Sequence, residues 1–156
     1  MAVEYCPRMV KRTRLPADIR ARLPRLADAL RGDPRVVAVY LFGSLARDAE
    51  GPLSDVDVAI LLAEPIDHAE VPRLALDYTD SVLKTLGTDE VSVVMLNTAS
   101  LTLRHRVIRD GQVLLDRAPV RRRDFEVQSQ SLYLDFKPVL DAYDDELLRQ
   151  LQNPSA

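Results

Sequence analysis

Two apolar runs, Val36–Phe42 and Val56–Leu62, form the strongest hydrophobic pattern in the chain. Runs of about seven residues rich in Val, Leu and Ile are typical of strands that are buried on both faces. The segment between the two runs is mostly small or polar. The pattern therefore predicts two core strands, with polar residues gathered where the first ends and the second begins.

Helical and strand patterns surround these two runs. A short helix is expected over Leu45–Asp48, and two further strands over Glu90–Asn97 and Gln112–Leu115. Apolar residues at steps of three and four predict longer helices over Ala17–Arg31, Glu70–Leu86, Leu101–Asp110 and Arg121–Leu151. This order implies an α/β (α+β) fold, in which a small mixed sheet is flanked by helices and followed by a long C-terminal helix.

Two prolines fall inside predicted helices. Pro24 should kink the first helix or mark its true start, and Pro138 should bend or break the last one near Lys137, because proline removes a backbone donor. The apolar stripe of the last helix is interpreted first as a face that closes the core. The end of this stripe is also a candidate surface for a partner.

Length and composition limit the possible classes of protein. The chain has 156 residues, of which 47% are hydrophobic and 29% charged, as in ordinary globular proteins. We expect an N-terminal arm over 1–16 and a single domain over 17–151. No stretch has the roughly 18–20 apolar residues of a membrane span and no secretory signal is evident, so the sequence predicts a cytoplasmic protein without a membrane partner.

Charge and cysteine content narrow the choice of partners. The net charge of −3 argues against direct nucleic-acid binding and favours a protein or a mononucleotide. Cys6 is the only cysteine, which excludes an internal disulfide and a cluster of thiolate ligands. We interpret it as an incidental residue of the arm.

The polar residues at the ends of the two core strands suggest a phosphate and metal site. Asp55 and Asp57 point to the same side of a strand about 6.8 Å apart, where their charges repel by roughly 2–3 kcal/mol. Mg²⁺ suits such a pair, since it is typically held by one or two carboxylates plus substrate phosphates. Gly43 lets the backbone approach a phosphate, and the amides that follow from Ser44 onward can hold it.

The segment GSLARDAEGPLSDVD resembles the GS-x10-DxD signature of the polymerase-β-like nucleotidyltransferases, with Ser54 in the position that commonly precedes the first Asp. The chain's size and two later segments, LNTASLTLRHRVIRDGQVLLDR and DFEVQSQSLYLDFKPVLDAY, look most like the minimal nucleotidyltransferase (MNT) antitoxins encoded beside HEPN toxins. The similarity runs over 36–143. It implies a polymerase-β-like fold, with Asp55 and Asp57 as catalytic residues and Mg²⁺ ligands, and with ATP as substrate.

The sequence departs from the family at the third acidic residue. Many members carry this acid on the third strand, and here the position falls on Ser92, which can neither bind metal as a carboxylate does nor act as a general base. Glu90, two residues earlier, faces the same side and is the candidate third catalytic acid. Either Glu90 takes this role, or the chain binds nucleotide and metal with impaired chemistry.

Two arginines are candidate nucleotide ligands, beside Gly43, Ser44 and Ser54. Arg47 could contact a triphosphate, because a guanidinium binds phosphate through two hydrogen bonds, or it could pair with the aspartates of the site. Arg104 falls within the apolar sector of its helix, where a charge needs a partner. We expect it to reach the acidic or phosphate site, with the alternative that it extends past the edge of the core.

The resemblance implies a nucleoside monophosphate transferase, which moves AMP from ATP to a tyrosine of a cognate HEPN toxin and thereby silences it. One alternative is an antitoxin that masks the toxin by binding alone, which Ser92 favours. Another is a small-molecule nucleotidyltransferase of the aminoglycoside type. The roughly 35 residues that follow the last strand leave little room for the additional substrate domain that such enzymes usually carry.

Overall fold

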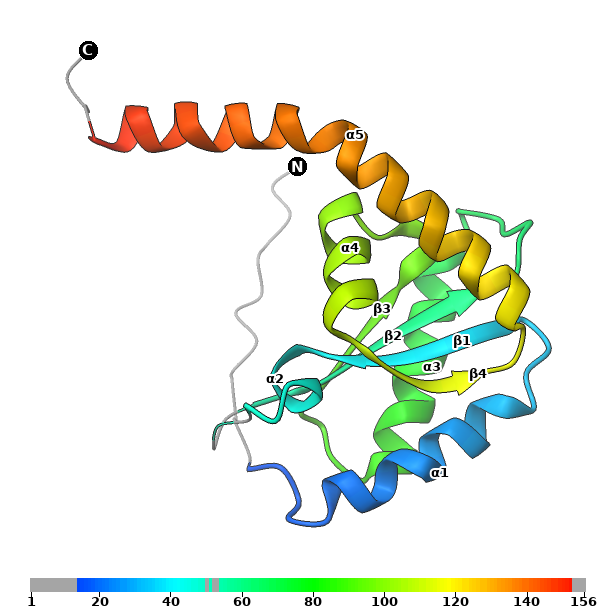
Figure 1. Cartoon of the computed structure of the whole chain (residues 1–156). Coiled ribbons are helices and arrows are strands. Elements are labelled where there is room, and N and C mark those ends of the chain that lie inside the picture. Colours follow the sequence, from blue (N-terminus) through cyan, green and yellow to red (C-terminus); the bar gives the residue numbers. More distant parts are fainter. Residues whose placement is uncertain (1–13, 50, 52–53, 153–156) are drawn as a thin grey trace, which may run out of the picture.

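Four strands form one mixed sheet at the centre of the computed structural model, which describes residues 14–49, 51 and 54–152 (Figure 1). The strands are β1 (Val36–Phe42), β2 (Val56–Leu62), β3 (Val91–Met95) and β4 (Gln112–Asp116). Their order is β3-β2-β1-β4; β1 pairs antiparallel with β2 and β4, and β2 pairs parallel with β3. The predicted mixed sheet is confirmed. Cys6 and most of the predicted arm lie outside the described residues.

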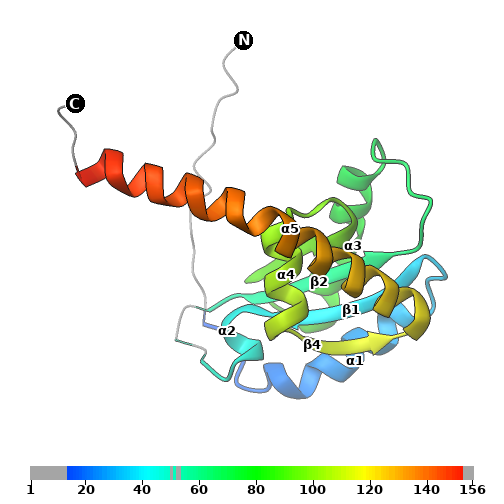
Figure 2. The same cartoon turned by 45° about the horizontal axis from the view of Figure 1, so that its top comes forward.

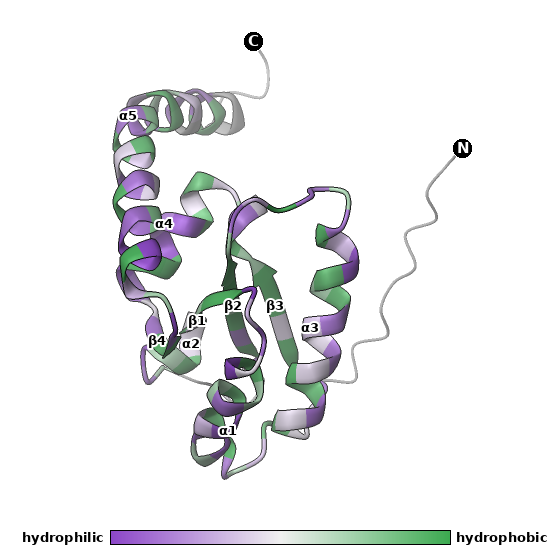
Figure 3. Ribbon diagram, turned by 90° about the vertical axis from the view of Figure 1, so that its right-hand side faces the viewer, coloured by the Kyte–Doolittle hydropathy of each residue, from purple (hydrophilic) through white to green (hydrophobic). Residues whose placement is uncertain are grey.

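Helices cover both faces of this sheet. Figures 1 and 3 show α1 and α3 on one face and α4 with the first half of α5 on the other. The helices are α1 (Ile19–Arg31), α2 (Gly43–Ala46), α3 (Val71–Leu86), α4 (Leu101–Asp110) and α5 (Pro119–Gln152). None of the described helices combines the length and the apolar character needed to cross a bilayer.

The core strands are buried as the sequence predicts. All seven residues of β1 are buried, and so are all residues of β2 except Asp57. Because side chains alternate along a strand, β1 supplies both apolar layers. Val39 and Leu41 pack towards α1 and α3, whereas Tyr40 and Phe42 pack towards α4 and α5.

The third strand is shorter than predicted. It ends at Met95 because a 3₁₀ turn, Leu96–Thr98, follows it directly. The amide side chain of Asn97 turns inward there: its oxygen accepts from the backbone N–H of Leu62 at 2.9 Å, and its nitrogen donates to the Leu62 carbonyl at 3.0 Å. The side chain of Asn97 therefore satisfies the backbone N–H and carbonyl of Leu62, which a neighbouring strand would otherwise pair.

The first half of α5 is fixed to the sheet. The hydroxyl of Tyr40 donates to Glu126 at 2.8 Å, and Arg122 pairs with both Glu126 and Asp116. Burial and the Glu126 carboxylate raise the pKa of the Tyr40 hydroxyl, so it remains protonated as a donor. Two further rings, those of His105 on α4 and Tyr133 on α5, stack with centroids 3.9 Å apart.

The second half of α5 leaves the domain. The helix continues through Pro138 without a break, and Figure 1 shows it bending near its middle before it projects away. Large apolar side chains in this part are exposed, including Phe136 at 46% and Tyr143 at 69%. The interpretation of the C-terminal stripe as core is therefore wrong for this half, although the helix itself is confirmed.

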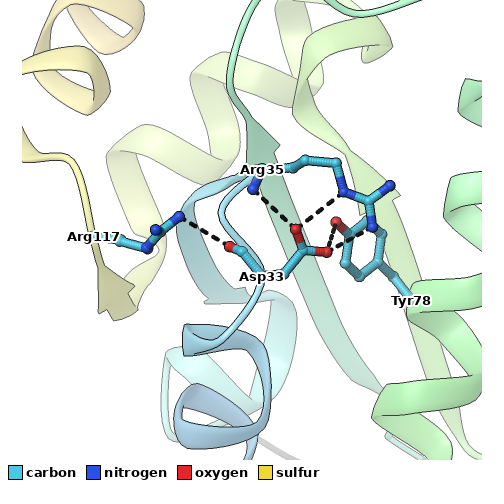
Figure 4. A network of polar contacts seen from close by, with 4 residues as sticks. All are labelled: Asp33, Arg35, Tyr78 and Arg117. Atoms are coloured by element: carbon cyan, nitrogen blue, oxygen red, sulfur yellow. Dashed lines mark hydrogen bonds and ion pairs between the residues drawn. The ribbon is translucent and has the colours of Figure 1, made fainter.

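Asp33 joins three parts of the fold (Figure 4). Its carboxylate accepts hydrogen bonds from the backbone N–H and the guanidinium of Arg35 and from the hydroxyl of Tyr78 on α3. Its backbone carbonyl accepts from Arg117 at 3.0 Å, just beyond β4. These contacts connect the turn before β1 to α3 and to the end of β4.

Asp33 should make stability depend on acid pH. The hydrogen bonds and charge of Arg35 hold the pKa of this carboxyl well below its usual range. Because the folded pKa lies below the unfolded value of about 3.9, the contribution is complete above about pH 5 and is lost as the pH falls through 4 towards the folded pKa. When the pH is lowered from 5 to 3, we expect the free energy of unfolding to fall less in the Asp33→Asn variant than in wild type. Urea unfolding at both pH values measures this, and equal losses would contradict it.

Candidate functional site

The pairing of β1 with β2 brings the Gly-Ser and Asp-x-Asp motifs together. Phe42, the last residue of β1, lies opposite Asp57 in the antiparallel register, so Gly43 follows directly beside it. We call Gly43, Ser44, Asp55 and Asp57 the candidate site. The antiparallel pairing of the two core strands brings the two motifs to the same end of the strand pair.

Gly43 lies against the carboxylate of Asp57. Its backbone has φ +76°, in the left-handed region that favours glycine, and a Cβ placed on it would lie only 2.0 Å from Asp57 Oδ2. A side chain at this position would displace the carboxylate. Gly43 therefore meets both requirements at once: it makes the turn out of β1, and it leaves space for Asp57.

Two side chains from outside the motif fix α2, the single turn that begins at Gly43. Arg20 of α1 donates to the carbonyl of Leu45 at 3.0 Å, and Gln112 of β4 donates to the carbonyl of Ala46 at 2.6 Å. These carbonyls lie at the end of a helix, where no following turn supplies an N–H group to hydrogen-bond with them. Neither positioning residue could be predicted from the sequence, because a long-range contact of this kind leaves no local pattern.

The two aspartates differ in environment. Asp55 is exposed, whereas Asp57 is half-buried at the start of β2. Burial raises the pKa of Asp57 above its usual value, and the nearby charge of Asp55 raises it further. A divalent cation between them would remove this repulsion, and two carboxylates on one strand face are the donors that Mg²⁺ takes alongside phosphate oxygens. The residues present therefore fit a magnesium site.

The third strand places Ser92 beside Asp57, because these two residues are partners in the parallel register of β2 and β3. Glu90 lies one step before β3, and its carbonyl accepts from the N–H of Val56 at 2.9 Å. Within the described part of the chain, no three His, Cys, Asp or Glu side chains come close enough together to hold a metal. The aspartate pair stays the predicted donor set for a cation, and the role of Glu90 as a base stays a hypothesis.

Two further predicted nucleotide ligands, Ser54 and Arg47, come from the segment between β1 and β2. Ser54 closes the loop before Asp55, where its hydroxyl accepts from the N–H of Gly51 at 2.8 Å. Arg47 is exposed at the end of α2, and its charge contributes to the lowered pKa of Asp110 at the end of α4, after the larger effect of Arg109. Arg47 is thus on the candidate-site side of the sheet, with its guanidinium accessible to solvent.

Arg104 does not join the candidate site, and this corrects the sequence-based expectation. Its guanidinium donates to the carbonyls of Asn97 and Ala99 at 2.7 and 3.0 Å, and it lies 5.3 Å from the centroid of the Phe125 ring. These partners lie near Leu62 at the far end of β2, about 17 Å along the strand from Asp57. The charge finds its partners in the turn before α4, where burial lowers the pKa of Arg104.

Comparison with known proteins gives a consistent result. The family model described as polymerase beta, nucleotidyltransferase matches residues 25–119, which contain the whole candidate site. The protein adenylyltransferase MntA of Shewanella oneidensis is 32% identical over 81 residues, 52% of this chain. The match spans 55% of that relative, about half its length.

Solved structures share the fold. A toxin–antitoxin complex with AMP-PNP aligns with a TM-score of 0.67 at 24% identity, covering 81% of this chain and 98% of that one. The MNT antitoxin in complex with tri-AMPylated Shewanella oneidensis HEPN toxin aligns with a TM-score of 0.62 at 24% identity, covering 83% and 98%. The predicted fold and the resemblance to MNT antitoxins are thereby confirmed.

Proposed function

Because the chain belongs to the polymerase beta nucleotidyltransferase family, we propose that it is a protein adenylyltransferase acting as an antitoxin. It transfers AMP from ATP to a tyrosine hydroxyl of a HEPN toxin encoded beside it. The observation that carries this proposal is the intact Gly-Ser and Asp-x-Asp pair on adjoining strand ends, with Gly43 and Asp57 in contact.

Each residue of the candidate site has a role in this reaction. Gly43 and Ser44 present backbone amides and a hydroxyl to the triphosphate, and the exposed Arg47 supplies a positive charge beside it. Asp55 and Asp57 would hold Mg²⁺, which neutralises phosphate charge when bound. The acceptor oxygen forms a bond to the α-phosphorus, and the bond from that phosphorus to the departing pyrophosphate breaks.

The acceptor proton needs a base. Glu90 and Asp57 are the two candidates, and they make different predictions. If Glu90 takes the proton, Glu90→Gln should lower kcat by about 10²–10⁴-fold, the usual contribution of a general base, and leave nucleotide binding unchanged. If Asp57 takes the proton, the kcat of Glu90→Gln should stay within about threefold of the wild-type value. Single-turnover transfer with Ser81→Ala on α3 as a distant control separates the two.

The acceptor is proposed from the relatives. One relative is named a protein adenylyltransferase, and one aligned antitoxin is bound to a tri-AMPylated HEPN toxin. A small domain with net charge −3 and one helix projecting from it suits a protein acceptor better than a nucleic acid. These features support an enzyme whose substrate is another protein.

The position of the label in ATP tests the transfer. The purified chain, Mg²⁺ and the neighbouring HEPN protein are incubated with ATP labelled at the α- or the γ-phosphate. Adenylyl transfer puts only the α label on the HEPN protein, whereas a kinase would put only the γ label there. Absence of both labels, with the two proteins still in a complex, would contradict the enzymatic proposal.

Ser92 favours a second candidate function, neutralisation of the toxin by binding alone. A serine beside Asp57 leaves the position of the usual third acid without a carboxylate. Ser92→Asp tests this idea, because a restored acid should add Mg²⁺ affinity. If the chain is an impaired transferase, Ser92→Asp should also raise the transfer rate by about tenfold or more. An unchanged but measurable rate would favour an enzyme that works without this acid, and no transfer by either form would favour binding alone.

A further inference from the structure

The exposed half of α5, residues 135–152, carries an apolar stripe without a partner within the described chain. We define the distal stripe as Phe136, Leu140, Tyr143 and Leu147. At 100° per residue these four positions fall within about 60° of one another around the helix. Tyr143 is 69% exposed and Leu147 45%. Exposed apolar rows of this kind mark interaction sites.

The distal stripe continues the face by which α5 packs on its own domain. Phe125 packs against the apolar cluster of the sheet and Ser129 is 1% exposed, and both lie within about 20° of Phe136 around the helix. Val127 and Leu134 lie on the opposite side and are 65% and 63% exposed. The apolar face is therefore directed to the domain side of the helix, beyond the point where the domain ends.

The helix projects on the same side of the domain as the candidate site. β4 runs away from that site, since Gln112 pairs with Leu41 and Asp116 with Ala38. α5 then runs back, and passes Tyr40 before Tyr133 stacks on α4. Figures 1 and 2 show its free end on the same side as α2. A protein held by the distal stripe would lie beside the candidate site.

The net charge of the distal half of α5 indicates what kind of partner surface fits the distal stripe. Residues 135–149 contain five acidic and two basic residues, a local net charge of −3, which equals that of the whole chain. A second copy that paired through the same helix face would have to use its own distal half, since that face of the first half is occupied by the domain. Such a pair would bring two acidic segments together, which is unfavourable.

We propose that the distal half of α5 docks the protein acceptor, through an apolar surface bordered by basic residues, and holds it at the candidate site. This inference rests on the proposed function for the identity of the acceptor. It makes α5 a specificity element that takes no part in the chemistry.

The test uses the full chain with the neighbouring HEPN protein. Phe136→Asp with Tyr143→Asp changes the stripe, and Val127→Asp with Leu134→Asp is the control with the same spacing and charge on the opposite face. We expect the stripe variant to raise both Kd and KM for the HEPN protein by at least tenfold, with kcat at saturation unchanged. The control should stay within about twofold for each constant.

Charge reversal gives an independent measurement. Asp135→Lys with Asp145→Lys should weaken HEPN binding several-fold at low salt and less at high salt, as expected for a basic partner. Tighter binding would overturn the assignment of a basic surface. Sedimentation of the chain alone tests whether a second copy occupies the stripe. A wild-type dimer that becomes a monomer in the stripe variant would assign the stripe to a second copy and overturn the inference.

The two proposals can fail separately. If the HEPN protein binds but receives no nucleotide, the proposed function fails, while the effect of the stripe variant on Kd still decides the docking inference. If nucleotide is transferred and the stripe variant leaves both Kd and KM unchanged, the docking inference fails alone. A HEPN protein that does not bind the wild-type chain overturns both.

Discussion

Replacing both aspartates of the candidate site, Asp55→Asn with Asp57→Asn, should abolish nucleotidyl transfer and leave the fold intact. The change removes the carboxylates that would hold Mg²⁺, an effect worth several kcal/mol in the transition state, or about 10³-fold or more in rate. It removes no packing, because asparagine has nearly the same shape. Single-turnover transfer and thermal unfolding measure the two effects.

The effect on stability should have a definite sign. Burial and the charge of Asp55 raise the pKa of Asp57, so the ionised pair destabilises the metal-free chain at neutral pH. The double variant should therefore unfold at the same temperature as wild type or higher without Mg²⁺, and it should no longer respond to Mg²⁺. Asp28→Asn with Asp80→Asn, two exposed carboxylates on α1 and α3, is the control with equal charge change. A large drop in Tm for the site variant would contradict this placement.

Gly43→Ala should reduce transfer by about 100-fold or more, although it adds only a methyl group. The new Cβ would lie 2.0 Å from Asp57 Oδ2, so the carboxylate must move. A displacement of about 1 Å in a reacting constellation costs on the order of 10² in rate. The positive φ of Gly43 adds about 1–2 kcal/mol of destabilisation for a residue with a side chain.

Gly32→Ala is the matched control for this substitution. Gly32 ends α1 with φ −71°, and a Cβ there would have no atom within 4 Å. We expect its transfer rate and Tm to remain close to those of wild type. Titration with Mg²⁺ and a non-hydrolysable ATP analogue should show weaker binding for Gly43→Ala alone. Wild-type binding and rate in this variant would mean that Asp57 adjusts at no cost, and the role assigned to Gly43 would be wrong.

The sequence predicted best those elements whose burial is nearly complete or whose ends carry a strong local signal. β1 and β2 have the predicted bounds because apolar runs record burial on both faces. The helix Leu101–Asp110 also has its predicted bounds, since Ser100 caps it by accepting from the N–H of Leu103. The candidate site follows from these strands, because their hairpin pairing joins the two motifs.

The sequence predicted poorly what depends on long-range contacts. Arg104 has the same helical position whether it faces a phosphate or a set of carbonyls, and only the location of the turn at Asn97 decides between them. Likewise, the periodicity of α5 is the same along its length, although only its first half has a surface to pack on. Periodicity records which face is apolar; the identity of the covering surface is a property of the fold or of a partner.

Intact mass after incubation with Mg²⁺, ATP and the neighbouring HEPN protein tests the central claim most directly, namely that Gly43, Ser44, Asp55 and Asp57 form a working nucleotidyltransferase site. We predict that the HEPN protein gains the mass of one or more adenylate groups with the wild-type chain and none with Asp55→Asn and Asp57→Asn. An unchanged mass with wild type, in a mixture where the two proteins form a stable complex, would contradict the claim and leave a binding antitoxin.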